Sequence, residues 1–173
     1  MLESAVRVRA AVVADVPELA RVQLEAALTG FAHIFPESVP KPTQAELERE
    51  WAPLVVDGIK TVLAAISKEA IVAGVAFGEY PALAPAGWGH LAKLYVLPEA
   101  SGRGIGANLH DVAVEQMRVA GYRDVWLWVL EGNERARGMY ERRGWRAQSE
   151  RRTDWPGSGV NEMGYALRLA EPN

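Results

Sequence analysis

The chain of 173 residues contains no cysteine, which excludes disulfides, thiolate metal sites and a cysteine nucleophile. Its three histidines, His33, His90 and His110, are widely spaced and form no HExxH motif, so no metal site is expected. No apolar run approaches membrane-spanning length, and the first ten residues lack the apolar core of a signal peptide. We therefore expect a cytoplasmic protein that does not associate with a membrane.

The chain also has no excess of basic residues. Nineteen Lys and Arg against 22 Asp and Glu give a net charge of −3 and a pI of about 5.7, which argues against nucleic acid as a partner. The remaining composition, 49% hydrophobic and 24% charged, is typical of a soluble globular protein. The length predicts a single domain over residues 1–173.

Apolar periodicity predicts the element order β-α-α-β-β-β-α-β-α-β-β. The first strand is expected at Val6–Ala10, Asp15 is expected to cap the first helix, and a T-x-x-E capping box opens the second at Thr43. Ser67–Ala70 predicts a hairpin turn, and a turn rich in Pro and Gly at 154–159 separates the last two strands. Because both hairpins require antiparallel pairing, we predict a mixed α/β or α+β fold.

The stretch SGRGIGA, Ser101–Ala107, follows an apolar strand and precedes a helix expected from about Gly104 to Val119. Gly102, Gly104 and Gly106 have no Cβ, so the backbone can adopt positive φ and approach a bulky anion. The N-terminus of a helix adds free amides and partial positive charge. From the glycines alone, a phosphate-binding loop and a ligand-free connection are equally good interpretations.

A dinucleotide-binding motif also fits this turn, whereas a Walker loop does not, because no Lys-Ser/Thr pair follows the glycines. Gly102-x-Gly104-x-x-Ala107 matches GxGxxA, and Glu131 closes the next strand where a ribose-binding acid would lie. Against this, the connection LPEAS is longer than that motif uses, and the final hairpin leaves no room for further parallel strands. A dinucleotide-binding oxidoreductase is therefore the alternative hypothesis.

A more specific pattern extends over residues 90–145, where strand, glycine turn, helix, strand and helix follow in close order. This region resembles the GNAT superfamily of acyl-coenzyme A dependent N-acetyltransferases, whose phosphate loop is [QR]-x-x-G-x-[GA]. Ser101-x-x-Gly104-x-Gly106 matches that loop except at Ser101, which stands in place of Gln or Arg.

The second motif of the family, N-x-x-[AS]-x-x-[FLM]-Y-x-x-x-G-[FW], also matches in register. The matching residues are Asn133, Ala136, Met139, Tyr140, Gly144 and Trp145. The resemblance implies a mostly antiparallel central sheet flanked by helices, with two splayed central strands that form an acyl-CoA cleft.

By the same resemblance, amides of the glycine turn would bind the pyrophosphate of acetyl-CoA, and the main chain of Leu94 and Val96 would bind its pantetheine arm. Arg103 would add a nearby charge. Asn133 would contact the cofactor, cap its helix, or do both. The predicted cofactor-binding residues are Leu94, Val96, Ser101, Gly102, Arg103, Gly104, Ile105, Gly106, Ala107, Asn133 and Tyr140.

Tyr140 is the general acid that the resemblance implies, with a core tyrosine as the alternative. An amine that attacks a thioester displaces a thiolate, and a phenol with a pKa near 10 stays protonated at neutral pH to meet it. The carbonyl would be polarised by a main-chain amide near Val96. The amine itself needs a base, for which Glu79, His90 and Glu131 are candidates, although each also fits a solvated strand end.

The acceptor is expected to bind near the segment TGFAHIFPESVPKP, where Phe31 and Phe35 would line a pocket or fill the core. Trp126 and Trp128 share one strand face and fit either role. We predict transfer of an acetyl group from acetyl-CoA to a primary amine of a small molecule, a protein N-terminus or a lysine, by direct attack. A non-catalytic CoA-binding domain is a further alternative, and the edge strands of the last hairpin are compatible with a homodimer.

Overall fold

The structure of the chain, a computed structural model, describes residues 6–80, 87–153 and 158–169. Its order of helices and strands is the order predicted from the sequence. The strands are β1 (Arg7–Ala10), β2 (Thr61–Ser67), β3 (Ala70–Glu79), β4 (Trp88–Val96), β5 (Asp124–Leu130), β6 (Arg146–Thr153) and β7 (Asn161–Arg168). The helices are α1 (Val16–Glu25), α2 (Gln44–Val56), α3 (Ile105–Val119) and α4 (Glu134–Glu141). Residues 154–157 of the predicted last turn lie outside the described residues.

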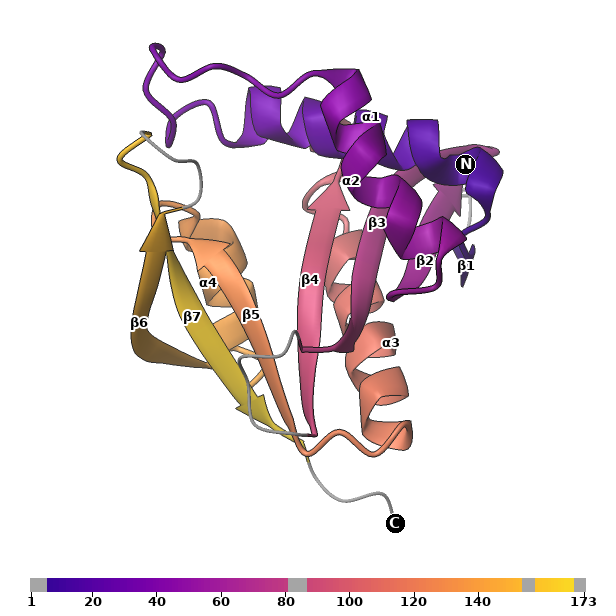
Figure 1. Cartoon of the computed structure of the whole chain (residues 1–173), viewed down its shortest axis with the longest axis vertical. Helices are drawn as coiled ribbons and strands as arrows, with labels where there is room; N and C mark the ends of the chain where they lie inside the picture. The colour runs from indigo at the N-terminus through magenta and orange to yellow at the C-terminus, as the bar shows by residue number, and fades with distance from the viewer. Residues whose placement is uncertain (1–5, 81–86, 154–157, 170–173) are drawn as a thin grey trace.

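The strands form one seven-stranded sheet in the order β1-β2-β3-β4-β5-β7-β6. Every neighbouring pair is antiparallel except β4 and β5, which run parallel at the centre. Figure 1 shows these two central strands close together at one end and far apart at the other. The mixed fold predicted from the two hairpins is confirmed, and so is the mostly antiparallel sheet that the resemblance implied.

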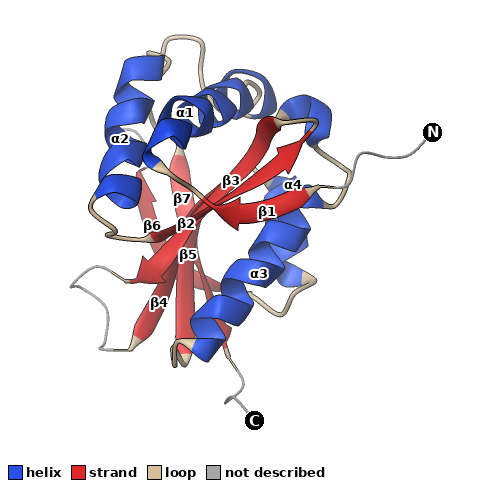
Figure 2. Cartoon of the chain, turned by 90° about the vertical axis from the view of Figure 1, so that its right-hand side faces the viewer, coloured by secondary structure: helices blue, strands red, loops and turns tan. Residues whose placement is uncertain are grey.

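Helices cover both faces of the β1–β4 half of the sheet (Figure 2), with α1 and α2 on one face and α3 on the other. Two glycines show how closely the layers approach. A Cβ at Gly74 of β3 would lie 2.5 Å from Cδ2 of Leu19 in α1, and one at Gly89 of β4 would lie 3.1 Å from Sδ of Met117 in α3. Both positions need glycine because larger side chains would separate helix and sheet.

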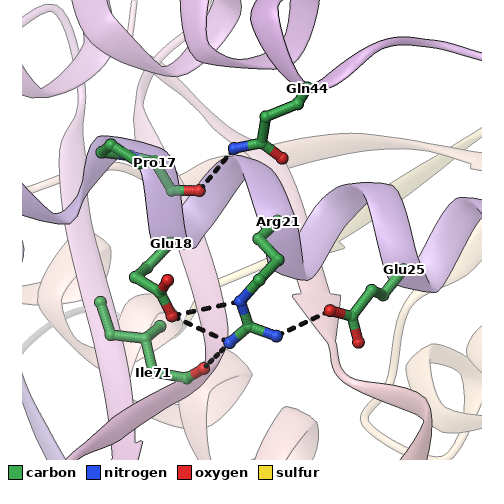
Figure 3. A network of polar contacts seen from close by, with 6 residues as sticks. All are labelled: Pro17, Glu18, Arg21, Glu25, Gln44 and Ile71. Carbon is green, nitrogen blue, oxygen red and sulfur yellow. Dashed lines mark hydrogen bonds and ion pairs between the residues drawn. The ribbon is translucent and has the colours of Figure 1, made fainter.

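Arg21 holds α1 against the sheet (Figure 3). Its guanidinium donates to Glu18 and Glu25, one turn away on either side, and to the main-chain oxygen of Ile71 in β3. Gln44 at the start of α2 donates to the carbonyl of Pro17, 2.8 Å away, which joins the two helices. These contacts fix the position of α1 and α2 on the sheet. Residues 26–43 connect the two helices.

The two predicted helix caps at this end of the chain differ in outcome. Thr43 forms the expected capping box, accepting from the Glu46 amide while Glu46 accepts from the Thr43 amide. Asp15 makes no side-chain cap bond to α1, so the predicted cap is wrong. Its carboxylate instead accepts two bonds from Arg9, at 2.6 and 2.9 Å, and one from the Val12 amide. The Arg9 guanidinium lowers the pKa of Asp15, so this ion pair is present at neutral pH.

Candidate active site

A cleft opens at the centre of the sheet because β4 and β5 pair over only three residues. The parallel register joins Trp88, Gly89 and His90 of β4 to the start of β5, and no further pair follows. Beyond His90 the two strands diverge, as Figure 1 shows. The edge of β4 that faces the gap therefore has no strand to bind its main-chain groups.

Hydrogen bonding between β3 and β4 indicates which residues face this gap. The amide of Leu97 donates to the carbonyl of Val72, 2.9 Å away. Since main-chain groups in an antiparallel pair point alternately to either side, Tyr95 bonds toward β3, and Leu94 and Val96 direct their amides and carbonyls toward the gap. Main-chain donors and acceptors are thus available along one wall of the cleft, at the two residues predicted for this role.

The glycine turn closes one end of the cleft. Gly102 and Gly104 have φ of 81° and 78°, in the left-handed region that favours glycine, and Gly104 is the N-cap of α3. Gly106 is in the first turn of α3, and a Cβ there would lie 3.0 Å from Cγ2 of Val96. These glycines let the N-terminus of α3 lie against the end of β4, with its free amides beside the cleft.

A groove of about 820 Å³ follows this turn. It is the donor groove from here on, and it is lined by β4, the glycine turn, the start of α3 and one face of α4. Ten of the eleven predicted cofactor-binding residues line it, namely Leu94, Val96, Ser101, Gly102, Gly104, Ile105, Gly106, Ala107, Asn133 and Tyr140. Arg103 is exposed and does not line it.

Asn133 caps α4, which is one of the two roles predicted for it. Its side-chain oxygen accepts from the amide of Ala136 at 3.2 Å and so caps α4. Asn133 also lines the donor groove, so a second contact there is compatible with the cap.

Tyr140 is on α4, where the donor groove meets a second cavity. The side chain is buried, at 7% exposure, and burial raises the pKa of its phenol. The hydroxyl is consequently protonated throughout the neutral range, as a proton donor must be. Its ring contacts the rings of His110, Trp145 and Tyr165, with centroids 5.8 to 6.4 Å apart.

The rings beneath Tyr140 are held by a polar chain that runs from two buried side chains to the surface. The indole of Trp145 donates to Nε2 of His110 at 2.8 Å, and Nδ1 of His110 lies 2.7 Å from a carboxylate oxygen of Asp111. Arg143 also donates to Asp111. For Nε2 to accept, the imidazole must carry its proton on Nδ1, so His110 is neutral here, and burial correspondingly lowers its pKa. This packing fixes the orientation of the Tyr140 ring.

The second cavity, of about 680 Å³, is the acceptor pocket from here on. Its outer wall is formed by residues 27–42, including Phe31 and Phe35, and its inner wall by β4 and by Trp128 of β5. Six residues line both cavities, namely Phe31, Leu94, Tyr95, Asn133, Ala136 and Tyr140. Two of these side chains, Tyr95 and Tyr140, carry a phenol that can exchange a proton.

Two ion pairs line the acceptor pocket. Lys93 of β4 donates to Glu50 of α2 at 2.7 Å, and Arg152 of β6 donates to Glu162 of β7. The Arg152 guanidinium also lies 4.7 Å from the centroid of the Trp128 ring, a cation–π distance. The pocket thus combines aromatic surface with paired charges of both signs.

Comparison with known proteins identifies the family. Residues 24–145, more than half of the chain, match the model of the acetyltransferase (GNAT) family. The chain belongs to this family. An uncharacterized N-acetyltransferase from Archaeoglobus fulgidus is 39% identical over 71 residues, which cover 41% of this GNAT chain and 45% of that relative. The match thus spans less than half the length of the curated relative.

Solved GNAT structures have the same fold over nearly the whole chain. The PaiA N-acetyltransferase of Thermoplasma acidophilum in complex with coenzyme A aligns with a TM-score of 0.73 and 19% identity, covering 95% of this chain and 99% of that one. A phosphinothricin acetyltransferase of Sinorhizobium meliloti in complex with AcCoA aligns with a TM-score of 0.74 and 18% identity, covering 95% and 88%. At such identities the likeness shows the fold alone.

The topology excludes the dinucleotide-binding alternative for this GNAT chain. That fold needs a parallel sheet in which the glycine motif joins neighbouring parallel strands by a tight turn. Here β4–β5 is the single parallel pair among the described strands. Glu131, the proposed ribose ligand, forms an ion pair with Arg151 and lines neither cavity.

Glu79 and His90, two of the three predicted candidates for the general base, lie at the closed end of the sheet. Glu79 ends β3 opposite the start of β4, and His90 belongs to the last paired position before the strands part. Neither residue lines the donor groove or the acceptor pocket. Burial, with smaller effects of Lys60 and Arg152, lowers the pKa of His90 to about 3, so its imidazole is a poor base at neutral pH. The geometry gives the base role of these two residues no support.

Several residues of the site were not expected from the sequence. Arg135 and Arg142 line the donor groove, and Glu50, Lys93 and the Arg152–Glu162 pair line the acceptor pocket. Arg135 follows Asn133 by two residues and could have been noticed there as a charge beside the second motif. The acceptor residues come from α2, β4, β6 and β7, and no local pattern joins them.

Two negative findings concern the described residues. Over 6–80, 87–153 and 158–169, no cluster of three or more His, Cys, Asp or Glu side chains is arranged to hold a metal ion. Across the same ranges, no helix is both long enough and apolar enough to cross a bilayer.

Proposed function

We propose that this chain transfers an acetyl group from acetyl-CoA to an amine by direct attack within a ternary complex. The observation that carries the proposal is the meeting of the donor groove and the acceptor pocket at Tyr140. Donor and acceptor can then be bound at the same time, with a residue able to donate a proton between them. The chain has no cysteine that could hold the acetyl group in between.

The residues of the donor groove fit acetyl-CoA. The N-terminal amides of α3, exposed by the left-handed glycines, suit the pyrophosphate, and the unpaired edge of β4 suits the amide groups of the pantetheine arm. Bound there, acetyl-CoA would supply a thioester whose acetyl group is activated for transfer. Amides of β4 near Val96 would polarise the thioester carbonyl.

Two protons must move for the reaction to balance. The attacking amine loses one as the amide bond forms, and the departing thiolate of CoA takes one up. Tyr140 supplies the second, because its buried hydroxyl stays protonated and the residue lines both cavities. The acidic side chains that line the acceptor pocket are Glu37, Glu50 and Glu162. These residues replace Glu79 and His90 as the groups to test for removing the proton of the attacking amine.

The size of the acceptor pocket supports a small-molecule amine as the first class of acceptor to test. About 680 Å³ is in the range of small-ligand pockets. Protein N-termini and lysines belong in the same panel, since either could insert one side chain or one terminus.

A binding and turnover experiment tests the proposal. Acetyl-CoA should raise the melting temperature of the protein, and NAD should not. Free thiol, measured with an amine panel, should then appear at a rate that depends on both substrates, with initial-rate plots that intersect as a ternary complex requires. Stabilisation by acetyl-CoA without thiol release from any amine would favour the non-catalytic alternative, and no stabilisation would reject the proposal.

A further inference from the structure

Three arginines of α4 and its C-terminal end line the donor groove, Arg135, Arg142 and Arg143. Arg143 is bound by the carboxylate of Asp111, at 2.8 Å. Arg135 and Arg142 have no carboxylate partner within residues 6–80, 87–153 and 158–169. These two cations are therefore available to a ligand in the groove.

Arg135 is placed directly over the glycine turn. A Cβ at Gly102 would lie 3.1 Å from Nη2 of Arg135, so the guanidinium occupies the space that any side chain at that position would take. Arg135 is in the first turn of α4, and the glycine turn precedes α3, so the starts of both helices line the same groove. Gly102 therefore provides both its positive φ and the room for Arg135.

The glycine turn itself supplies no cation to the groove. Ser101 lines the groove and is uncharged, at the position where the family motif has Gln or Arg. Arg103, the one charged residue of SGRGIGA, is exposed and lies outside the lining. A polyanionic donor bound by backbone amides alone would leave most of its charge without a partner.

We propose that Arg135 binds the pyrophosphate of the acyl donor, so that α4 provides the cation that Ser101 cannot. This inference rests on the proposed function, because it takes CoA as the ligand of the donor groove. A guanidinium is suited to the task, since its planar fork can donate two parallel bonds to one phosphate group.

Calorimetric titration of three proteins with two ligands tests the assignment. The proteins are the wild type, Arg135→Gln and the matched control Arg103→Gln, which removes an exposed arginine from the same turn. The ligands are CoA and dephospho-CoA, which lacks the 3′-phosphate and keeps the pyrophosphate. The melting temperature of each free protein shows that the surface substitutions leave the fold intact.

Arg135→Gln should raise the Kd by about tenfold or more for both ligands, whereas Arg103→Gln should change it less than twofold. An unchanged Kd in Arg135→Gln would overturn the inference, as would an equal loss in Arg103→Gln. A loss seen with CoA and absent with dephospho-CoA would move the contact to the 3′-phosphate and overturn the pyrophosphate assignment. If the wild type itself fails to bind CoA, the proposed function falls, and that result is visible before any variant is compared.

Discussion

The donor groove and the acceptor pocket meet at Tyr140 and are built in different ways. The donor groove is made largely of main chain, namely the edge of β4, a left-handed glycine turn and the start of α3. The acceptor pocket is made of side chains from residues 27–42, α2, β4, β5, β6 and β7. A site made from backbone needs only a few glycines at fixed spacing, so it leaves a local sequence motif, whereas a site made from distant side chains leaves none.

This difference suggests which substitutions will affect one substrate and spare the other. Variants of Tyr140, which lines both cavities, should change the rate of the transfer itself. Variants of one cavity should change the affinity for one substrate alone.

The largest effect on turnover is expected for Tyr140→Phe. Tyr140 lines both cavities, and the change removes its hydroxyl while the ring stays packed on His110 and Trp145. We expect kcat to fall by roughly 100-fold or more, with the Kd for acetyl-CoA nearly unchanged. Steady-state thiol release and calorimetry measure the two quantities. Equal kcat in the variant would remove Tyr140 from proton transfer.

A smaller effect, confined to the donor, is expected for Gly106→Val. The Cβ alone would lie 3.0 Å from Val96, so the branched side chain must push the start of α3 away from β4. We expect the Kd for acetyl-CoA to rise roughly tenfold, and Gly106→Ala to give a smaller rise. Should the KM for the amine rise as much as the donor Kd, the two cavities would not be separable in the way described here.

The converse effect is expected for Phe35→Ala, because Phe35 lines the acceptor pocket and not the donor groove. Loss of its ring should raise the KM for the amine roughly tenfold and leave the Kd for acetyl-CoA within twofold. The measurement needs one amine accepted by the wild type. A changed donor Kd with an unchanged amine KM would contradict the assignment of this wall.

The smallest effect on turnover is expected for His90→Gln, since His90 lines neither cavity. Its influence should appear in stability. The pKa of His90 is about 3 in the folded chain, whereas a histidine in the unfolded chain has the ordinary value of 6.5. Between pH 3 and 6.5 the unfolded chain therefore binds a proton that the folded chain does not. Stability is therefore complete above pH 6.5 and decreases as the pH falls toward 3, by up to about 1.4 kcal/mol per pH unit for this group.

Urea unfolding between pH 7.5 and 5 tests this dependence, in a range where most carboxylates do not titrate. Wild type should lose stability as the pH falls, and His90→Gln should lose less. His110, whose pKa burial also lowers, leaves a residual slope of the same sign in the variant. The matched control is His33→Gln in the exposed part of the 27–42 segment. A slope identical in wild type and His90→Gln would show that His90 is not protected from protonation by the fold.

Elements and their order could be predicted because their causes are local. Thr43 and Glu46 are three residues apart and cap α2 as expected, and Lys68 and Glu69, with φ of 48° and 64°, form the two-residue turn of the expected hairpin. Asp15 has the right residue type for a cap, and its failure has a tertiary cause. Arg9 of β1 lies close enough to bind the carboxylate in a two-bond contact between opposite charges, which is stronger than a single bond from one cap amide.

The sequence by itself determined the family, and it predicted the glycine turn, Asn133 and Tyr140 as site residues, because each depends on residue types at short, regular spacing. Only the tertiary structure decided at which end β4 and β5 part. The parting point depends on how far along the sheet two strands, whose paired residues are 36 apart in sequence, remain bonded. That one fact places Leu94 and Val96 in the open cleft and Glu79 and His90 at its closed end. The tertiary structure also places Arg135 over Gly102. The two residues lie on separate segments, and no sequence motif spans the distance between them.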